Sequence, residues 1–244
     1  MDSNNNSPVG LDFKKLYLAW FGLIFSTLII FIIGGIVRGD PAPPILRLNI
    51  VSDFSLFAII LYVIGSMVAV YILKNYLNIK GMSLSDIGIT KQFPKSSFLY
   101  IVVGIIIGSF LYTLVEYLFQ LVNVNMYWRS VKTTYIILNT PVDFILTIIF
   151  AVIIGPICEE IIFRGYVLTT FLKKGYKNYT AILLSSLIFT SVHIYHGPGV
   201  LLFIFFWSFI PSILYLKYKS LFPAMLMHSI NNTIAYILVP IIFH

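Results

Sequence analysis

The segment GPICEEIIFRGYV, residues 155–167, places two adjacent glutamates and an arginine in an almost wholly apolar part of the chain. Glu160 and Arg164 are four residues apart, so they lie on one face of a helix and can form an ion pair. Glu159 points about 100° away from Glu160, so it can face a different neighbour. A carboxylate in an apolar surround that lacks a cationic partner suits the role of general base. The segment therefore predicts one balanced and one reactive carboxylate.

Two histidines and an asparagine stand out later in the chain. The stretches 179–216 and 221–244 contain no Asp, Glu, Lys or Arg, but they contain His193, His228 and Asn232. Ionisable residues inside a membrane cost roughly 2.5 to 3.5 kcal/mol even on lenient scales, so each is a functional-site hypothesis. His228 and Asn232 are four residues apart and share one helix face.

These residue types fit the hydrolysis of an amide bond. The reaction needs a base for water, a proton shuttle and donors aimed at the developing oxyanion. A glutamate with a histidine supplies the first two, and a second histidine with an asparagine supplies the donors. The same residues also fit a structural ion network or the ion pathway of a transporter. In addition, Glu159, His193 and His228 resemble a catalytic zinc set, although no HExxH motif is present.

The elements that must position these residues are membrane-spanning helices. The 244 residues are 59% hydrophobic and 10% charged, and the mean hydropathy is +0.95, which indicates an integral membrane protein. A spanning helix needs roughly 20 apolar residues. We therefore expect an all-α, polytopic transmembrane helical bundle of about 7–8 spans with a buried polar cavity. The apolar runs are Leu16 to Val37, Phe54 to Leu73, Ser97 to Val122, Val142 onward, Tyr179 to Tyr195, Val200 to Leu216 and Leu221 to Phe243.

The charge distribution predicts the orientation of the chain. With a cytoplasmic N-terminus, twelve of the sixteen lysines and arginines fall on inner segments and four on outer loops, as the positive-inside rule expects. We expect residues 1–15 to form a short cytoplasmic tail, 16–96 a transmembrane hairpin with a cytoplasmic loop, and 97–244 the catalytic transmembrane core of a multi-pass cell-membrane protein. The net charge of +7 does not indicate nucleic-acid binding, because the cations lie at the ends of apolar runs.

Several further residues have local interpretations. The run that starts at Val142 is too long for one straight span, so we expect Gly155 and Pro156 to kink or break it. Gly104 and Gly108 form a GxxxG pair, which predicts close helix packing. The remaining predictions are structural: a loop position for His196, helix packing for Asn231, a role at an interface or in a hydrogen bond for Glu116, and a core position for Cys158.

The three polar segments resemble a known family. EEIIFR, FTSVH and HSINN match the EExxxR, FxxxH and HxxxN signatures of the CPBP group of intramembrane proteases. This group includes the CAAX prenyl endopeptidases and bacterial proteins linked to bacteriocin processing and immunity. The resemblance covers residues 155–232, and residues 84–90 resemble a loop that often precedes the core. The resemblance implies that Glu159 and His193 activate a water and that His228 and Asn232 stabilise the oxyanion, with support from Glu160, Arg164 and Phe189.

The resemblance implies an intramembrane endopeptidase that cleaves a membrane-associated or leader-type peptide, such as a bacteriocin or signal precursor. We favour a glutamic mechanism without a cofactor over one that uses zinc. The expected partners are a peptide or protein substrate and the lipid bilayer. One alternative is a non-catalytic immunity or scaffold protein. A less favoured one is a proton-coupled transporter, which would show an inverted repeat or paired broken helices, and the sequence shows neither.

Overall fold

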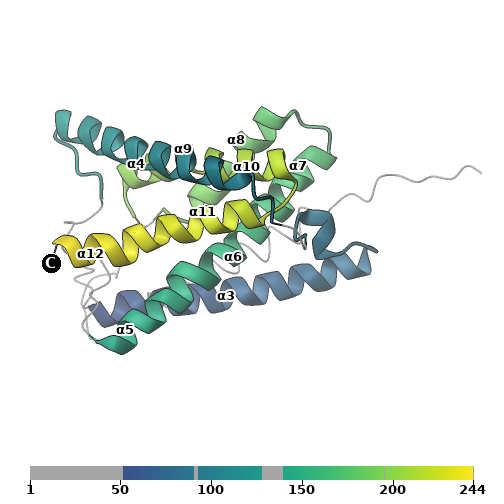
Figure 1. Cartoon of the computed structure of the whole chain (residues 1–244), viewed down its shortest axis with the longest axis horizontal. Helices are drawn as coiled ribbons and strands as arrows, with labels where there is room; N and C mark the ends of the chain where they lie inside the picture. Colours follow the sequence, from purple (N-terminus) through teal and green to yellow (C-terminus); the bar gives the residue numbers. More distant parts are fainter. Residues whose placement is uncertain (1–51, 91–92, 128–139, 195, 244) are drawn as a thin grey trace, which may run out of the picture.

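The computed structural model describes residues 52–90, 93–127, 140–194 and 196–243, and the regular structure in these ranges is entirely helical (Figure 1). The predicted span from Leu16 to Val37 lies outside the described residues. The elements are α3 (Ser52–Ile79), η1 (Leu84–Ile87), α4 (Ser97–Leu121), α5 (Pro141–Leu146), η3 (Thr147–Ile154), α6 (Gly155–Glu160), η4 (Ile161–Leu168), α7 (Thr169–Lys173), α8 (Asn178–Ser191), α9 (Pro198–Trp207), α10 (Phe209–Tyr218), α11 (Phe222–Thr233), η5 (Ile234–Leu238) and α12 (Val239–Phe243).

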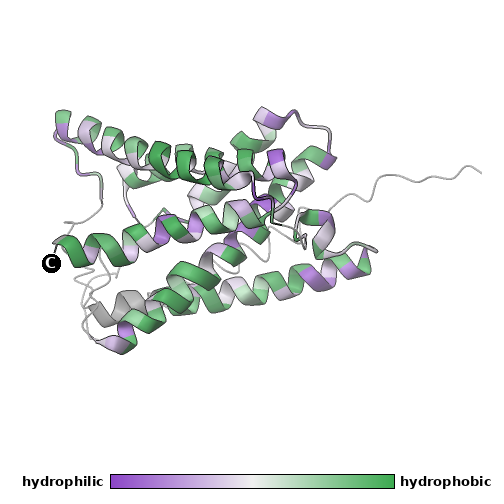
Figure 2. Ribbon diagram, in the orientation of Figure 1, coloured by the Kyte–Doolittle hydropathy of each residue, from purple (hydrophilic) through white to green (hydrophobic). Residues whose placement is uncertain are grey.

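Five helices in these ranges are long and apolar enough to cross a membrane. Hydrophobic residues cover most of their length, while α11 is hydrophilic over much of its C-terminal half (Figure 2). The outer face of α4 exposes large apolar side chains that suit contact with lipid, among them Phe98, Ile106 and Phe110. The five candidate spans are Ile59–Ile79, Ser97–Leu121, Pro141–Lys173, Pro198–Tyr218 and Phe222–Ile242.

The predicted span from Tyr179 to Tyr195 is shorter than expected. Helix α8 has 14 residues and ends at Ser191, which is less than the roughly 20 residues that a full span needs. A turn begins at Val192, and the next helix begins at Pro198 after Gly197, whose φ is 127°. This early end leaves His193 in the turn after α8 rather than within the helix.

The helix that carries the two glutamates runs without a break for 33 residues, Pro141–Lys173. It crosses the bundle diagonally (Figure 1), so it is inclined to the neighbouring helices. At Gly155 and Pro156 the helix does not break, but its hydrogen-bond pattern changes. The preceding turns of η3 are π-helical, and the Gly155 N–H donates to the Phe150 carbonyl, five residues back. Proline lacks an N–H, so a change in the hydrogen-bond register around it is expected. Such π-helical turns are frequent at functional sites.

The glycine pair on α4 allows close helix packing, as predicted. A Cβ at Gly104 would lie 2.8 Å from Cγ2 of Ile210, and one at Gly108 would lie 3.1 Å from Cδ1 of Trp207. Helix α4 therefore packs closely against α9 and α10, the helices that support Trp207 and Ser208.

The short helix η1 fastens the loop between α3 and α4 to the core. Ser83 and Asp86 cap its start, with the Ser83 N–H donating to Asp86 Oδ2 at 2.7 Å, and this hydrogen bond lowers the pKa of Asp86. Ile87 is fully buried, and the Leu221 N–H donates to the Gly88 carbonyl at 2.8 Å. The segment 84–90 is therefore an integral part of the core.

Gly88 should not tolerate a side chain. Its φ is 98°, and an added Cβ would lie 2.4 Å from Cε2 of Tyr215. We expect Gly88→Ala to reduce the free energy of unfolding by about 1 to 3 kcal/mol through backbone strain, with a further loss from the clash. Gly81→Ala is the matched control, because Gly81 also has a positive φ of 68° but has nothing within 4 Å of the added Cβ. Equal thermal unfolding shifts for the two variants in detergent would contradict the packing argument.

The turns after α3, α7 and α10 carry lysines, and they lie at one end of the bundle. Helix α12 ends at the other end (Figure 1). The Lys173 ammonium lies 3.9 Å from the Met82 sulfur, which joins the turn after α7 to the loop after α3. Tyr218 donates to the Ser96 carbonyl at 3.1 Å, which joins the end of α10 to the same loop. These contacts hold the three turns together at one end of the bundle.

Accessibility labelling tests the predicted orientation of the chain. In a Cys158→Ala background, we expect cysteines at Lys80 and Lys177 to react with an impermeant maleimide only after the cells are permeabilised. A cysteine at Asn125 or after His244 should react in intact cells. If the cysteine after His244 needed permeabilisation, the chain would require an eighth span.

Candidate active site

Glu160 and Arg164 form the predicted ion pair. Arg164 Nη1 donates to Glu160 Oε1 at 2.9 Å, and both side chains are fully buried. An uncompensated charge in such a place is strongly destabilising. The pairing therefore stabilises both residues inside an apolar helix bundle.

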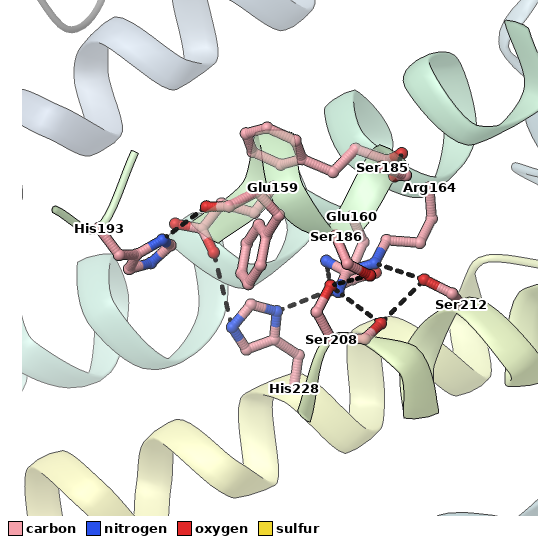
Figure 3. Close-up of polar contacts among 11 residues, drawn as sticks. Glu159, Glu160, Arg164, Ser185, Ser186, His193, Ser208, Ser212 and His228 are labelled. Atoms are coloured by element: carbon pink, nitrogen blue, oxygen red, sulfur yellow. Dashed lines mark hydrogen bonds and ion pairs between the residues drawn. The ribbon is translucent and has the colours of Figure 1, made fainter. Parts of the chain in front are cut away.

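His228 lies between the two glutamates (Figure 3). Its Nδ1 is 2.8 Å from Glu160 Oε1, and its Nε2 is 3.5 Å from Glu159 Oε2. The three side chains come from α6 and α11, which are distant in sequence. Glu160 is thus shared between a cation on its own helix and a histidine on another, whereas the sequence predicted only the first of these partners.

The protonation of His228 at Nδ1 follows from the geometry. Glu160 is a carboxylate in its ion pair with Arg164, and a carboxylate only accepts hydrogen bonds. We therefore assign a proton to Nδ1, so that Nδ1–H donates to Glu160. The other nitrogen, Nε2, faces Glu159, the carboxylate that the sequence predicts to be reactive.

Phe189 is the aromatic centre of the site. Its ring centroid lies 4.7 Å from that of His193 and 6.1 Å from that of His228, and the Arg164 guanidinium carbon lies 4.4 Å above its face. His193 Nδ1 is 2.9 Å from the Phe189 carbonyl. Because a carbonyl only accepts, Nδ1 carries a proton and Nε2 is the nitrogen that can accept one. In Figure 3, His193 lies toward the Glu159 end of the cluster and Arg164 toward the Glu160 end.

Asn232 makes a contact that the sequence did not predict. Its Nδ2 donates to the Ala151 carbonyl at 2.9 Å. In an α-helix this carbonyl would accept from Gly155, whose N–H goes to Phe150 instead. In a π-helix it would accept from residue 156, which is a proline without an N–H. Asn232 thus satisfies a carbonyl that Pro156 leaves without a helical partner, and its second N–H is the one that could reach a substrate.

A group of hydroxyls surrounds Arg164, and the sequence analysis missed it. Nη2 donates to Ser208 Oγ at 2.8 Å and to the Ser208 carbonyl at 3.2 Å, and Nε is 3.5 Å from Ser212 Oγ. Ser208 Oγ in turn donates to Ser186 Oγ at 3.0 Å. The available signal was the spacing of Ser208 and Ser212, four apart in a span that is otherwise apolar.

Tyr62 on α3 was also missed. Its phenol interacts with the Glu159 carboxylate, so a helix that precedes the motif-bearing segments contributes to the site. A tyrosine in an apolar helix has no spacing signal of its own, because it also fits packing.

The zinc alternative would need Glu159, His193 and His228 to meet around one ion. Within the described ranges, no three His, Cys, Asp or Glu side chains gather as ligands of one metal ion. The set Glu159, His193 and His228 is therefore not arranged around a common point.

Two other residues with sequence predictions lie close to the site. The ring of His196 stacks on that of His193 with centroids 5.8 Å apart. Cys158 is buried, as its predicted core position requires.

Comparison with known proteins identifies the segment that carries these residues. Residues 141–234 match the family described as Type II CAAX prenyl endopeptidase Rce1-like. This segment is similar to the protease domain of Rce1-like proteins. No curated protein and no solved structure matches the chain.

The Rce1-like domain confirms the CPBP family that the sequence motifs predicted. It spans less than half of the 244 residues but includes all three motifs, from Glu159 to Asn232. It also includes the serines whose hydroxyls surround Arg164, whereas Tyr62 lies outside it. The family is one of membrane proteases, in agreement with the apolar helices of this chain.

Proposed function

We propose that this protein is an intramembrane endopeptidase that hydrolyses a peptide bond with water activated by Glu159. The observation that supports this most directly is the position of His228, with one ring nitrogen toward each glutamate. A purely structural ion pair between Glu160 and Arg164 would not need a second carboxylate and a histidine beside it. Buried titratable groups arranged in this way are typical of catalytic sites.

The charges of the cluster suggest the resting state. Glu160 and Arg164 balance each other, and an ionised Glu159 balances a doubly protonated His228. In that state Nε2–H points to Glu159 across 3.5 Å. The cluster is then neutral overall, which a low-dielectric interior favours.

The reaction follows from these positions. Glu159 takes a proton from water, and the resulting hydroxide attacks the carbonyl carbon of the peptide. Because Glu159 is then neutral, its hold on His228 Nε2–H weakens, and this donor can turn to the oxyanion with the second N–H of Asn232. The C–N bond breaks as the leaving amine takes a proton from Glu159 by way of Nε2 of His193.

We infer a membrane-associated or leader-type peptide as the substrate, with the cleaved bond close to the cytoplasmic side. The family description names CAAX prenyl endopeptidases, so a farnesylated CAAX peptide is the comparison substrate. Comparing the membrane peptidomes of cells that express the wild type or Glu159→Ala tests the function. Peptides that accumulate uncleaved only with Glu159→Ala would support a protease, whereas identical peptidomes would favour the immunity or scaffold alternative.

Metal analysis separates the two hydrolytic mechanisms. We expect the purified wild type to remain fully active in chelator without stoichiometric zinc, because the described residues do not gather three metal ligands. Inductively coupled plasma mass spectrometry measures the zinc content of the wild type, His193→Ala and His228→Ala. Stoichiometric zinc that is lost in both variants, with activity restored to the stripped wild type by added zinc, would overturn the glutamic mechanism.

A further inference from the structure

The hydroxyls of Ser186, Ser208 and Ser212 around Arg164 are linked by more hydrogen bonds than the burial of one charge requires. A hydroxyl has one proton to donate and two lone pairs. Ser208 Oγ donates its proton to Ser186 Oγ at 3.0 Å, so its lone pairs remain for Arg164 Nη2 at 2.8 Å. Ser212 Oγ donates to the Ser208 carbonyl at 2.8 Å. All three serines are at most 1% exposed.

The chain itself places Ser208 at a break between two helices. Helix α9 ends at Trp207 and α10 begins at Phe209, because Pro211 has no N–H for the carbonyl four residues earlier. The break directs both the hydroxyl and the carbonyl of Ser208 toward Arg164. The Phe189 ring covers one face of the guanidinium, and Ser208 accepts hydrogen bonds from its edge. Both contacts fix the plane of the guanidinium.

The position of Arg164 determines the position of His228. Arg164 Nη1 and His228 Nδ1 contact the same oxygen, Glu160 Oε1, at 2.9 and 2.8 Å. If the guanidinium moves, this oxygen moves with it, and the acceptor of the His228 Nδ1–H is displaced. The chain of contacts thus runs from Ser186 through Ser208, Arg164 and Glu160 to His228 (Figure 3).

We propose that Ser208, oriented by Ser186, is a positioning residue that holds Arg164 so that Glu160 fixes the protonation and orientation of His228. The effect on turnover rests on the proposed function, whereas the effect on His228 does not. Ser208 and Ser186 lie outside the three sequence motifs, and the hydrogen bonds of their hydroxyls go to Arg164 and to each other.

The test uses a matched pair of serines on α8. Ser185 and Ser186 are adjacent and equally buried, but Ser185 Oγ donates to the Phe163 carbonyl at 2.8 Å and takes no part in the Arg164 contacts. We compare Ser208→Ala and Ser186→Ala with Ser185→Ala. Thermal unfolding in detergent shows whether each variant is folded, and Ser186→Ala carries the test if Ser208→Ala is not recovered.

The decisive measurement is the ¹⁵N NMR spectrum of histidine-labelled protein. The chain has four histidines, and His228→Gln assigns the signal of His228. We expect Nδ1 of His228 to be protonated in the wild type and in Ser185→Ala, and to shift toward a mixture of ring states in Ser208→Ala and Ser186→Ala. An unchanged His228 signal in the last two variants would overturn the proposal, whether or not the wild type cleaves peptides.

Turnover gives the second measurement, on a peptide found by the peptidome comparison. Groups that orient metal ligands typically contribute roughly 10- to 100-fold to activity. We expect a similar effect here, so kcat should fall by about that factor in Ser208→Ala while KM stays constant. Ser185→Ala should keep the wild-type kcat. Equal losses of kcat in Ser208→Ala and Ser185→Ala would indicate a merely structural role.

Discussion

Replacing Glu159 with glutamine should reduce turnover by about 10²- to 10⁴-fold, the usual contribution of a general base. Glutamine has the size of glutamate and can still accept a hydrogen bond from His228, but it cannot take a proton from water. We expect the variant to insert into the membrane and to bind substrate with an unchanged KM. The measurement is kcat of the purified protein in liposomes, with a peptide found by the peptidome comparison.

Glu116→Gln is the control for this variant. Glu116 lies on α4, is half-buried and belongs to none of the three motifs, so its replacement should leave kcat unchanged. Near-normal turnover by Glu159→Gln would remove Glu159 from the mechanism. Equal losses in both variants would show that any glutamate in the bundle has the same effect.

Arg164→Ala should reduce the free energy of unfolding by about 3 to 5 kcal/mol, the typical result of removing one partner from a buried ion pair. The variant leaves Glu160 fully buried with His228 as its remaining polar partner, and it removes the contacts of Ser208 and Ser212. We expect lower abundance in the membrane and a lower midpoint of thermal unfolding in detergent, in addition to the loss of activity.

Two further variants sharpen this test. Lys177→Ala removes an exposed cation from the turn before α8 and should leave the midpoint unchanged. The double variant Glu160→Gln with Arg164→Met removes both charges and should recover part of the lost stability, because no buried charge is then left unpaired. An Arg164→Ala variant as stable as the wild type would show that the ion pair does not support the fold.

Much of the site could be predicted from the sequence, because helix periodicity fixes neighbours within one helix. The pairing of Glu160 with Arg164 follows from a spacing of four residues on one continuous helix. The close packing of α4 follows from Gly104 and Gly108, since glycine lets two helix backbones approach.

Contacts between helices could not be predicted in the same way. Periodicity does not determine which ring nitrogen of His228 meets which glutamate, because that depends on the relative rotation and depth of α6 and α11. The contact of Asn232 with Ala151 depends on a π-helical turn before Pro156, and the sequence predicted only a kink or break there. His193 lies beyond the end of α8, because this helix ends at Ser191 and the apolar run continues to Tyr195.

The serines around Arg164 were missed for a different reason. A search for charged residues in apolar sequence finds Arg164, but it ignores hydroxyls, which are common in membrane helices. An arginine has five N–H donors, and a single glutamate oxygen satisfies few of them. Counting the donors of a buried arginine would therefore have directed attention to Ser208 and Ser212.

The most direct test of the central claim follows the oxygen of water into the product. The purified wild type in liposomes is incubated in H₂¹⁸O with a peptide found by the peptidome comparison, and the products are analysed by mass spectrometry. Hydrolysis predicts one ¹⁸O atom in the new carboxyl terminus, with no labelled product from Glu159→Gln in the same time. No cleavage of any such peptide by the wild type, or labelled product at the same rate from Glu159→Gln, would contradict the account.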